Sequence, residues 1–236
     1  MSEEQAFHGF TKETITFFLA LKRNNNREWF EGHRDIYEAQ VLERAKAFVR
    51  AMGPLLKTIS PDIIAAPKIN KSLFRINRDT RFSLDQSPYK TNLGIYFWEG
   101  NRSRMDSSGF YFHVEPPKLL LGVGYYMFSG HLLERYRRAV VHPKFGQDLA
   151  HIIKKIKKMG VYELGGKHYK RIPAGFDPSH PNAELLLHNG LHAGWEGDIP
   201  KEFFAAELVD FVFEKFRAAA PLHRWLVAIT AGTHFG

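Results

Sequence analysis

The residues best suited to chemistry in this sequence are the cations between positions 68 and 92. This segment holds six basic and two acidic residues, so it carries net +4 of the chain's formal +8. Apolar residues such as Leu73, Ile76 and Tyr89 alternate with the charges, which favours a folded segment over a disordered basic tail. A guanidinium held in place offers a rigid fork of donors to phosphate or carboxylate. We therefore predict an anion-binding site on a central sheet, formed by Lys71, Arg75, Asn77, Arg78, Arg81 and Lys90.

A second set of polar residues lies between Tyr111 and Glu115. Tyr111, His113 and Glu115 alternate with apolar residues, so in a β-strand they occupy the face opposite to the core. His113 and Glu115 are candidate catalytic residues, as an acid and a base or as an oriented pair. The same alternation around Arg75 predicts a strand that places Arg75 and Asn77 on this polar face. The alternative is an ordinary solvated face.

Two periodicities describe the elements that would position these residues. Helical spacing follows a predicted N-cap at Thr11, and a long amphipathic helix begins at Arg27 and ends or kinks at Gly53-Pro54. Alternation with a period of two predicts four strands, Leu73–Arg78, Thr91–Trp98, Phe110–Val114 and Leu119–Tyr126. Further helices are predicted at Leu132–Val141, from Pro143 to about Lys158, at Ala183–His188 and at Pro200–Ala219, with Pro221 ending the last one.

This order of elements predicts the α+β class. We expect a central antiparallel or mixed sheet of about four or more strands, packed by N- and C-terminal helices. Residues 160–200 are rich in glycine and proline and are expected to be mostly loops. Neither an internal repeat nor a linker is evident, so a single domain is expected over residues 1–236.

Composition excludes several classes of function. The chain has no cysteine, which rules out disulfides, thiolate catalysis and cysteine-ligated metal. His188 and His192 are four apart, but Asn189-Gly190 breaks the helix that this spacing would need, so no metal is expected. The sequence contains no Walker-type glycine loop, dinucleotide fingerprint or nucleophile elbow, so it indicates no cofactor. With no apolar leader and no run of about 18 apolar residues, we expect a cytoplasmic protein without a membrane partner.

The overall charge leaves other partners open. A sequence pI near 9.6 favours acidic ligands, and the first hypothesis is a phosphorylated or carboxylated small molecule. The alternatives are a nucleic-acid-binding module and an interaction protein without catalytic activity. We expect at most weak nucleic-acid binding, because the excess charge is concentrated in residues 68–92. The residues name neither a reaction nor an oligomeric state.

Several motifs resemble one known family. They are Asn24–Phe30, Lys71–Ser83, Ser87–Asn92, Gly109–Tyr111 and Pro173–Pro178. From about Phe10 to Leu226 the chain resembles a group of uncharacterised bacterial and fungal proteins filed as domain of unknown function 2461. The resemblance implies a single cytosolic domain and no activity, so it assigns no catalytic residue. Leu84 and Gln86 stand where members of the family often carry Lys or Asp.

Overall fold

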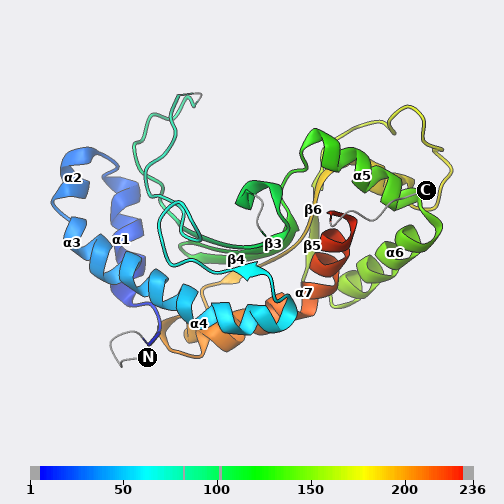
Figure 1. Ribbon diagram of the computed structural model, residues 1–236. Helices are drawn as coiled ribbons and strands as arrows, with labels where there is room; N and C mark the ends of the chain where they lie inside the picture. The colour runs from blue at the N-terminus through cyan, green and yellow to red at the C-terminus, as the bar shows by residue number, and fades with distance from the viewer. Residues whose placement is uncertain (1–5, 82, 101–102, 231–236) are drawn as a thin grey trace. The chain divides into compact units, whose positions relative to one another are not determined.

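The computed structural model describes residues 6–81, 83–100 and 103–230 and is built around a six-stranded antiparallel sheet (Figure 1). The strand order is β1-β2-β3-β4-β6-β5. The strands are β1 (Ile63–Ile64), β2 (Leu93–Glu99), β3 (Gly109–Glu115), β4 (Lys118–Tyr125), β5 (Glu163–Lys167) and β6 (His188–Asp198). Together with the helices described below, this sheet confirms the predicted α+β class.

The chain divides into two compact units, each assembled from three separate segments. Unit 1 comprises Met1–Phe97, Tyr111–Leu121 and Glu196–Glu214, and unit 2 comprises Trp98–Phe110, Gly122–Trp195 and Lys215–Gly236. Strands β2, β3, β4 and β6 each begin in one unit and end in the other. Neither unit is therefore a continuous stretch of sequence.

The N-terminal helices belong to unit 1. Thr11 caps the first helix as predicted, and its hydroxyl accepts a hydrogen bond from the backbone N–H of Thr14 at 3.3 Å. The expected long helix from Arg27 is instead divided into four consecutive helical segments. The helical elements are α1 (Lys12–Arg23), α2 (Arg27–Glu31), α3 (Arg34–Ile36), a π-helix (Tyr37–Leu42) and α4 (Glu43–Ile59).

The helix was predicted to end or kink at Gly53-Pro54, and of these alternatives the end is wrong, because α4 continues through Pro54 to Ile59. A proline inside a helix costs about 3 kcal/mol. Met52 and Leu56 on either side of it are completely buried, so the core contacts of this face hold the helix together. The free energy gained by burying the apolar face of α4 exceeds the cost of having a proline inside the helix.

The predicted strand Leu73–Arg78 is also wrong. Leu73 forms a bridge with Ile95 of β2, but Asn77 forms its bridge with Tyr89. The segment therefore pairs with two partners in turn and is not one continuous strand. Residues 76–78 and 88–90 form the stem of a long loop, which we call the arm (residues 76–90; Figure 1). The stem is closed by the N–H of Arg78 donating to the Pro88 carbonyl and that of Lys90 donating to the Ile76 carbonyl, at 2.9 and 2.8 Å.

The two faces of β3 and β4 are as predicted. Phe112, Val114 and Leu119 are fully buried, whereas Tyr111 and His113 are half-buried. Within unit 1 the Phe112 ring lies 4.7 Å from that of Phe48 and 6.1 Å from that of Phe10, between ring centroids. Alternation with Arg75 predicts that Phe74 lies on the core face, but Phe74 is only half-buried, so this prediction is wrong.

Unit 2 contains two strands that were not predicted. Strands β5 and β6 pair antiparallel, with Glu163 opposite Gly194 and Gly165 opposite His192. The glycines of this region do not form turns; they allow another side chain or backbone to pack closely against the strand. A Cβ on Gly165 would lie 2.1 Å from Nε2 of His192, and one on Gly190 would lie 2.1 Å from the carbonyl oxygen of Tyr126.

The remaining helices follow the predictions in part. Pro143 begins a helix as expected, and the short helix before His188 is a 3-10 turn. The final helix does not end at Pro221, because buried Leu222, Trp225 and Leu226 continue its inner face. These elements are α5 (Gly130–Val141), α6 (Pro143–Lys158), α7 (Leu208–Thr230) and 3-10 turns at Arg104–Asp106, Ala183–Leu187 and Lys201–Phe204.

Candidate functional site

A continuous row of side chains in unit 1 joins the basic segment to the predicted His–Glu pair. Nζ of Lys90 lies 5.5 Å from the centre of the Phe74 ring, and that ring meets Tyr111 edge-on at 6.0 Å. The hydroxyl of Tyr111 is 2.8 Å from Nδ1 of His113. Nε2 of His113 is 3.7 Å from a carboxylate oxygen of Glu115. We call these five residues the Lys90 row.

The chemistry of the row depends on His113. Burial lowers the pKa of His113, and the nearby Glu115 carboxylate opposes that shift. The neutral ring is therefore favoured near neutral pH. In one tautomer of that form Nδ1 accepts the hydrogen bond of the Tyr111 hydroxyl, and the N–H at Nε2 faces Glu115. This arrangement orients the Tyr111 oxygen, while Nε2 of His113 lies 3.7 Å from Glu115, which is beyond the distance of a direct hydrogen bond.

A glycine leaves room beside the row. Gly94 of β2 is buried, and a Cβ there would lie 3.1 Å from both the Tyr111 hydroxyl oxygen and the Phe74 ring. Any larger side chain at this position would press on both rings. Tyr96 lies on the same strand two residues along, with its ring centre 6.4 Å from that of Tyr111. The aromatic part of the row thus includes a surface of three rings around a glycine.

Two of the predicted anion-binding arginines already have carboxylate partners. Arg81 makes two hydrogen bonds to Asp79, at 2.9 and 2.7 Å, and this contact lowers the pKa of Asp79 to about 2. Arg78 forms an ion pair with Asp85. Hydrogen bonds from Ser87, followed by the Arg78 contact, lower the pKa of Asp85. In this structure these arginines neutralise acids of their own loop.

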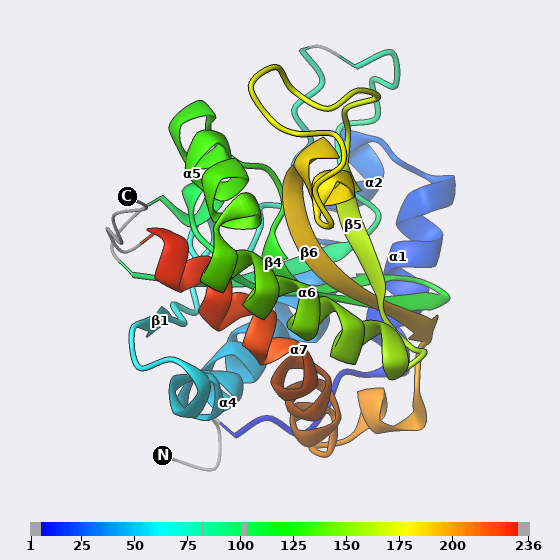
Figure 2. The same cartoon turned by 90° about the vertical axis from the view of Figure 1, so that its right-hand side faces the viewer.

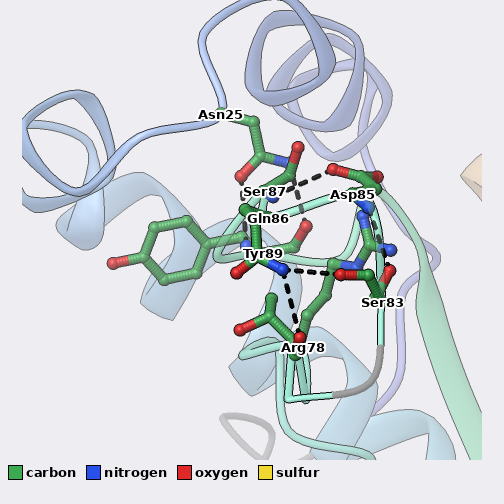
Figure 3. A network of polar contacts seen from close by, with 8 residues as sticks. Asn25, Arg78, Ser83, Asp85, Gln86, Ser87 and Tyr89 are labelled. Atoms are coloured by element: carbon green, nitrogen blue, oxygen red, sulfur yellow. Dashed lines mark hydrogen bonds and ion pairs between the residues drawn. The ribbon is translucent and has the colours of Figure 1, made fainter.

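The arm is also folded by its polar side chains (Figure 3). Gln86 donates from Nε2 to the carbonyl of Ser83 at 2.6 Å, and the backbone N–H of Ser87 donates to Asp85 at 2.9 Å. Asn25 holds the base of the arm: it donates to the Tyr89 carbonyl at 2.9 Å and accepts from the Tyr89 N–H at 3.1 Å. The Asn25 amide thereby forms two hydrogen bonds with the backbone of Tyr89, as a neighbouring β-strand would.

The three consecutive asparagines before α2 each have a structural role. Asn24 donates to the Ala20 carbonyl at the end of α1, and Asn26 caps α2 by accepting from the N–H of Trp29. Asn25 binds the arm. Helix capping therefore accounts for Asn24 and Asn26, and Asn25 fastens the segment that carries the predicted anion site.

The other predicted site residues lie at the surface near the row. Lys71, Arg75 and Asn77 are exposed. The carbonyl of Arg75 accepts a hydrogen bond of 3.0 Å from Nζ of Lys90, which links Arg75 to the row through its backbone. Within the described ranges the Arg75 guanidinium has no hydrogen bond or ion pair. It is thus available to a ligand, although the side chain that meets Tyr111 is that of Phe74.

Unit 2 contains a polar triad that sequence patterns did not indicate. The Ser108 hydroxyl lies 2.9 Å from Nδ1 of His223, and Nε2 of His223 lies 3.2 Å from a carboxylate oxygen of Glu99. Ser108 and His223 are buried, with 1% and 0% of their surface exposed. A serine enclosed in this way is out of reach of a substrate, so this triad is a packing feature of unit 2. His223 is more than 100 residues away in sequence from both Ser108 and Glu99, and only the three-dimensional contact reveals the triad.

Two further searches limit the kinds of site. Across residues 6–81, 83–100 and 103–230, no group of three or more His, Asp or Glu side chains is arranged to hold a metal ion. In the same part of the chain, every helix is too short or too polar to cross a membrane.

Comparison with known proteins supplies a family but no activity. A search of curated proteins finds no match. The model of a family described as conserved hypothetical protein (DUF2461) matches residues 13–225, which is most of the chain and includes both the Lys90 row and the arm. The chain therefore belongs to the conserved hypothetical protein family DUF2461.

Proposed function

We propose that this protein binds a small phosphorylated or carboxylated molecule at the Lys90 row, with an aromatic or flat apolar part of that molecule lying against the rings. The observation that carries the proposal is the contact of one cation, Lys90, with the same aromatic surface that positions Tyr111 and His113. An ammonium group has three donors. One of them binds the Arg75 carbonyl, which fixes the position of the charge.

The row suits such a ligand better than it suits free phosphate. Lys90 provides the charge for a phosphate or carboxylate, and the second cation proposed for the ligand is Arg75, whose backbone carbonyl accepts a hydrogen bond from Lys90. Phe74, Tyr96 and Tyr111 provide apolar area for the rest of the molecule. His113 and Glu115 are the residues that would move a proton if the bound molecule reacts.

The test is a binding titration with four anions: phenyl phosphate, benzoate, inorganic phosphate and acetate. We expect phenyl phosphate and benzoate to bind more tightly than their non-aromatic counterparts, inorganic phosphate and acetate. Lys90→Gln should weaken phenyl phosphate by about 10- to 100-fold, since a hydrogen bond to a charged group contributes about 1.5–3 kcal/mol. Arg75→Ala should weaken it in the same direction with an unchanged melting temperature.

Lys22→Gln is the matched control, because Lys22 is an exposed lysine of α1 in the same unit. It removes one charge without touching the row. Equal losses of anion affinity in Lys22→Gln and Lys90→Gln would mean that the anions are attracted by the overall charge of the protein and not by the Lys90 row. Failure of all four anions to bind at millimolar concentration would contradict the proposal.

A further inference from the structure

The positive charge of the protein is concentrated in unit 2. Counting Lys and Arg against Asp and Glu, with His neutral, unit 2 has 16 basic and 7 acidic residues and a net charge of +9. Unit 1 has 17 basic and 18 acidic residues and a net charge of −1. The +4 of residues 68–92 is therefore cancelled by acids elsewhere in its own unit. The largest excess of cations therefore belongs to unit 2, whereas the Lys90 row belongs to unit 1.

Helix α6 carries the densest part of this charge. It has five lysines, Lys144, Lys154, Lys155, Lys157 and Lys158, against one acid, Asp148. All five lysines are exposed, and none of them forms an ion pair with any residue that the structure describes. In this they differ from Arg78 and Arg81 of the arm, which are neutralised by neighbouring aspartates.

Three of these lysines and one histidine form a stripe along one side of the helix. Lys144, His151, Lys155 and Lys158 follow one another at spacings of seven, four and three residues, which places them on the same face. We call these four residues the α6 stripe. At 1.5 Å per residue it is about 21 Å long, which matches about six successive phosphates on one strand of a B-form duplex.

The opposite face of α6 is fully occupied. Leu149, Ile153 and Ile156 are buried in unit 2, and the indole N–H of Trp225 donates to the Phe145 carbonyl at 3.0 Å. Both views place α6 at the outside of this unit, and in Figure 2 it faces the viewer. The helix is thus a rigid support that presents its lysines outward.

Complementarity to the helix dipole does not account for the stripe. Cations near a helix C-terminus are favoured by the dipole, and this covers Lys155 and Lys158. Lys144 lies in the first turn, where a cation is disfavoured and where α6 has no acidic residue. The cations of the stripe are therefore spread along the whole of α6 and are not confined to its C-terminal end.

We infer that the α6 stripe binds the phosphate backbone of duplex nucleic acid, independently of sequence. The stripe contains no Phe, Tyr or Trp side chain on which successive unpaired bases could stack, so contact with phosphates is favoured over single-stranded recognition. A membrane surface is disfavoured because a helix that lies in a bilayer inserts its apolar face, and here that face is inside the protein. This surface is separate from the proposed small-molecule site.

The test measures binding of a labelled 20-base-pair duplex by fluorescence anisotropy between 50 and 200 mM salt. The stripe variant is Lys144→Gln, Lys155→Gln and Lys158→Gln together. The control variant is Lys12→Gln, Lys22→Gln and Lys57→Gln, which removes the same charge from exposed lysines of unit 1. Glutamine is a good helix former, and unchanged melting temperatures check that both variants fold.

We expect the slope of log affinity against log salt to fall by about 2.7 in the stripe variant, at about 0.9 for each lost phosphate contact. Its affinity at 50 mM salt should drop at least about 100-fold, while the control should stay within about 3-fold. Duplexes of scrambled sequence should bind equally well, and Lys90→Gln should have no effect.

Equal losses of affinity in the two triple variants would overturn the inference, because binding would then depend on the net charge of the protein and not on the position of the lysines. Tighter binding to a single strand of the same length would overturn the choice of duplex. Binding to vesicles rich in phosphatidylserine without binding to duplex would identify the partner as a membrane and would also contradict the inference.

Discussion

The hydroxyl oxygen of Ser108 lies 2.9 Å from Nδ1 of His223, inside unit 2 and closed off from solvent. The other ring nitrogen of His223 faces Glu99 at 3.2 Å. His223 therefore satisfies two polar groups that come from the neighbourhood of β2 and β3, and its ring also lies 4.7 Å from that of Phe110. This histidine connects the last helix of unit 2 to the strand segments beside it.

His223→Phe tests this connection because it keeps the ring and removes both nitrogens. We expect a loss of about 2–4 kcal/mol in the free energy of unfolding, since a buried hydroxyl and a mostly buried carboxylate each lose a partner. Urea unfolding measures the loss. Ser108→Ala should cost about 1 kcal/mol, and the double variant should cost less than the sum of the two. Additive costs would show that the two side chains act independently.

Acid should destabilise the protein through its buried histidines. Burial lowers the pKa values of His188 and His192 in unit 2 and of His113 in unit 1. Below the ordinary histidine pKa of about 6.5, the unfolded chain then binds more protons than the native state. The contribution of these neutral histidines to the free energy of unfolding is therefore fully present above that pH and is lost as the pH falls through their lowered folded-state pKa values.

The measurement is urea unfolding at several pH values between about 7.5 and 5. Each such histidine contributes at most about 1.4 kcal/mol per pH unit. His192→Gln should make the profile flatter, whereas substitution of exposed His131 by Gln should leave it unchanged. Stability that is constant or rises toward acid pH would contradict this prediction.

Phe112 should be one of the most sensitive positions of unit 1. Its side chain is completely buried against Phe10 and Phe48, so Phe112→Ala should cost about 3–5 kcal/mol if the cavity does not collapse. Phe204→Ala is the control, because the Phe204 side chain is 41% exposed, and it should cost less than about 1.5 kcal/mol. Equal costs in denaturant unfolding would mean that the core of unit 1 lies elsewhere.

Asn25 should control how firmly the arm is held. In Asn25→Asp a carboxylate oxygen replaces the donor to the Tyr89 carbonyl, which leaves two acceptors facing each other. We expect the arm to open more often, with trypsin cleaving after Arg78 and Arg81 several times faster. Asn24→Asp makes the same charge change at α1 and should not accelerate cleavage in the arm. Equal rates in both variants would remove Asn25 from this role.

The sequence was most informative where structure is local. Alternation correctly separated buried Phe112 and Val114 from half-buried Tyr111 and His113, and Pro143 correctly indicated a helix start. Local rules failed where tertiary contact decides. Glycines such as Gly165 and Gly190 resemble turn residues in sequence, but they are required because another side chain or backbone lies within about 2 Å of where a Cβ would be.

The charge pattern along the chain is less informative than the apolar pattern for a related reason. A window of 25 residues records neighbours along the chain, whereas charges cancel between neighbours in space. The arm's excess cations are balanced within unit 1, and two of its arginines are paired with Asp79 and Asp85. Alternation along the strand predicts that His113 and Glu115 share one face, and they lie 3.7 Å apart, but their catalytic role stays a prediction. The contact of Lys90 with Phe74 depends on how the arm folds back and could not be predicted from the sequence.

The passage of the chain between the two units has a consequence for how such a protein is inherited. The chain crosses from one unit to the other five times. A recombination event with two breakpoints that transferred all of unit 2 would also carry Tyr111–Leu121 and Glu196–Glu214 of unit 1. Gene fusion or exchange therefore cannot move one unit alone: any single stretch of the gene that encodes all of unit 2, and with it helix α6, also encodes parts of unit 1.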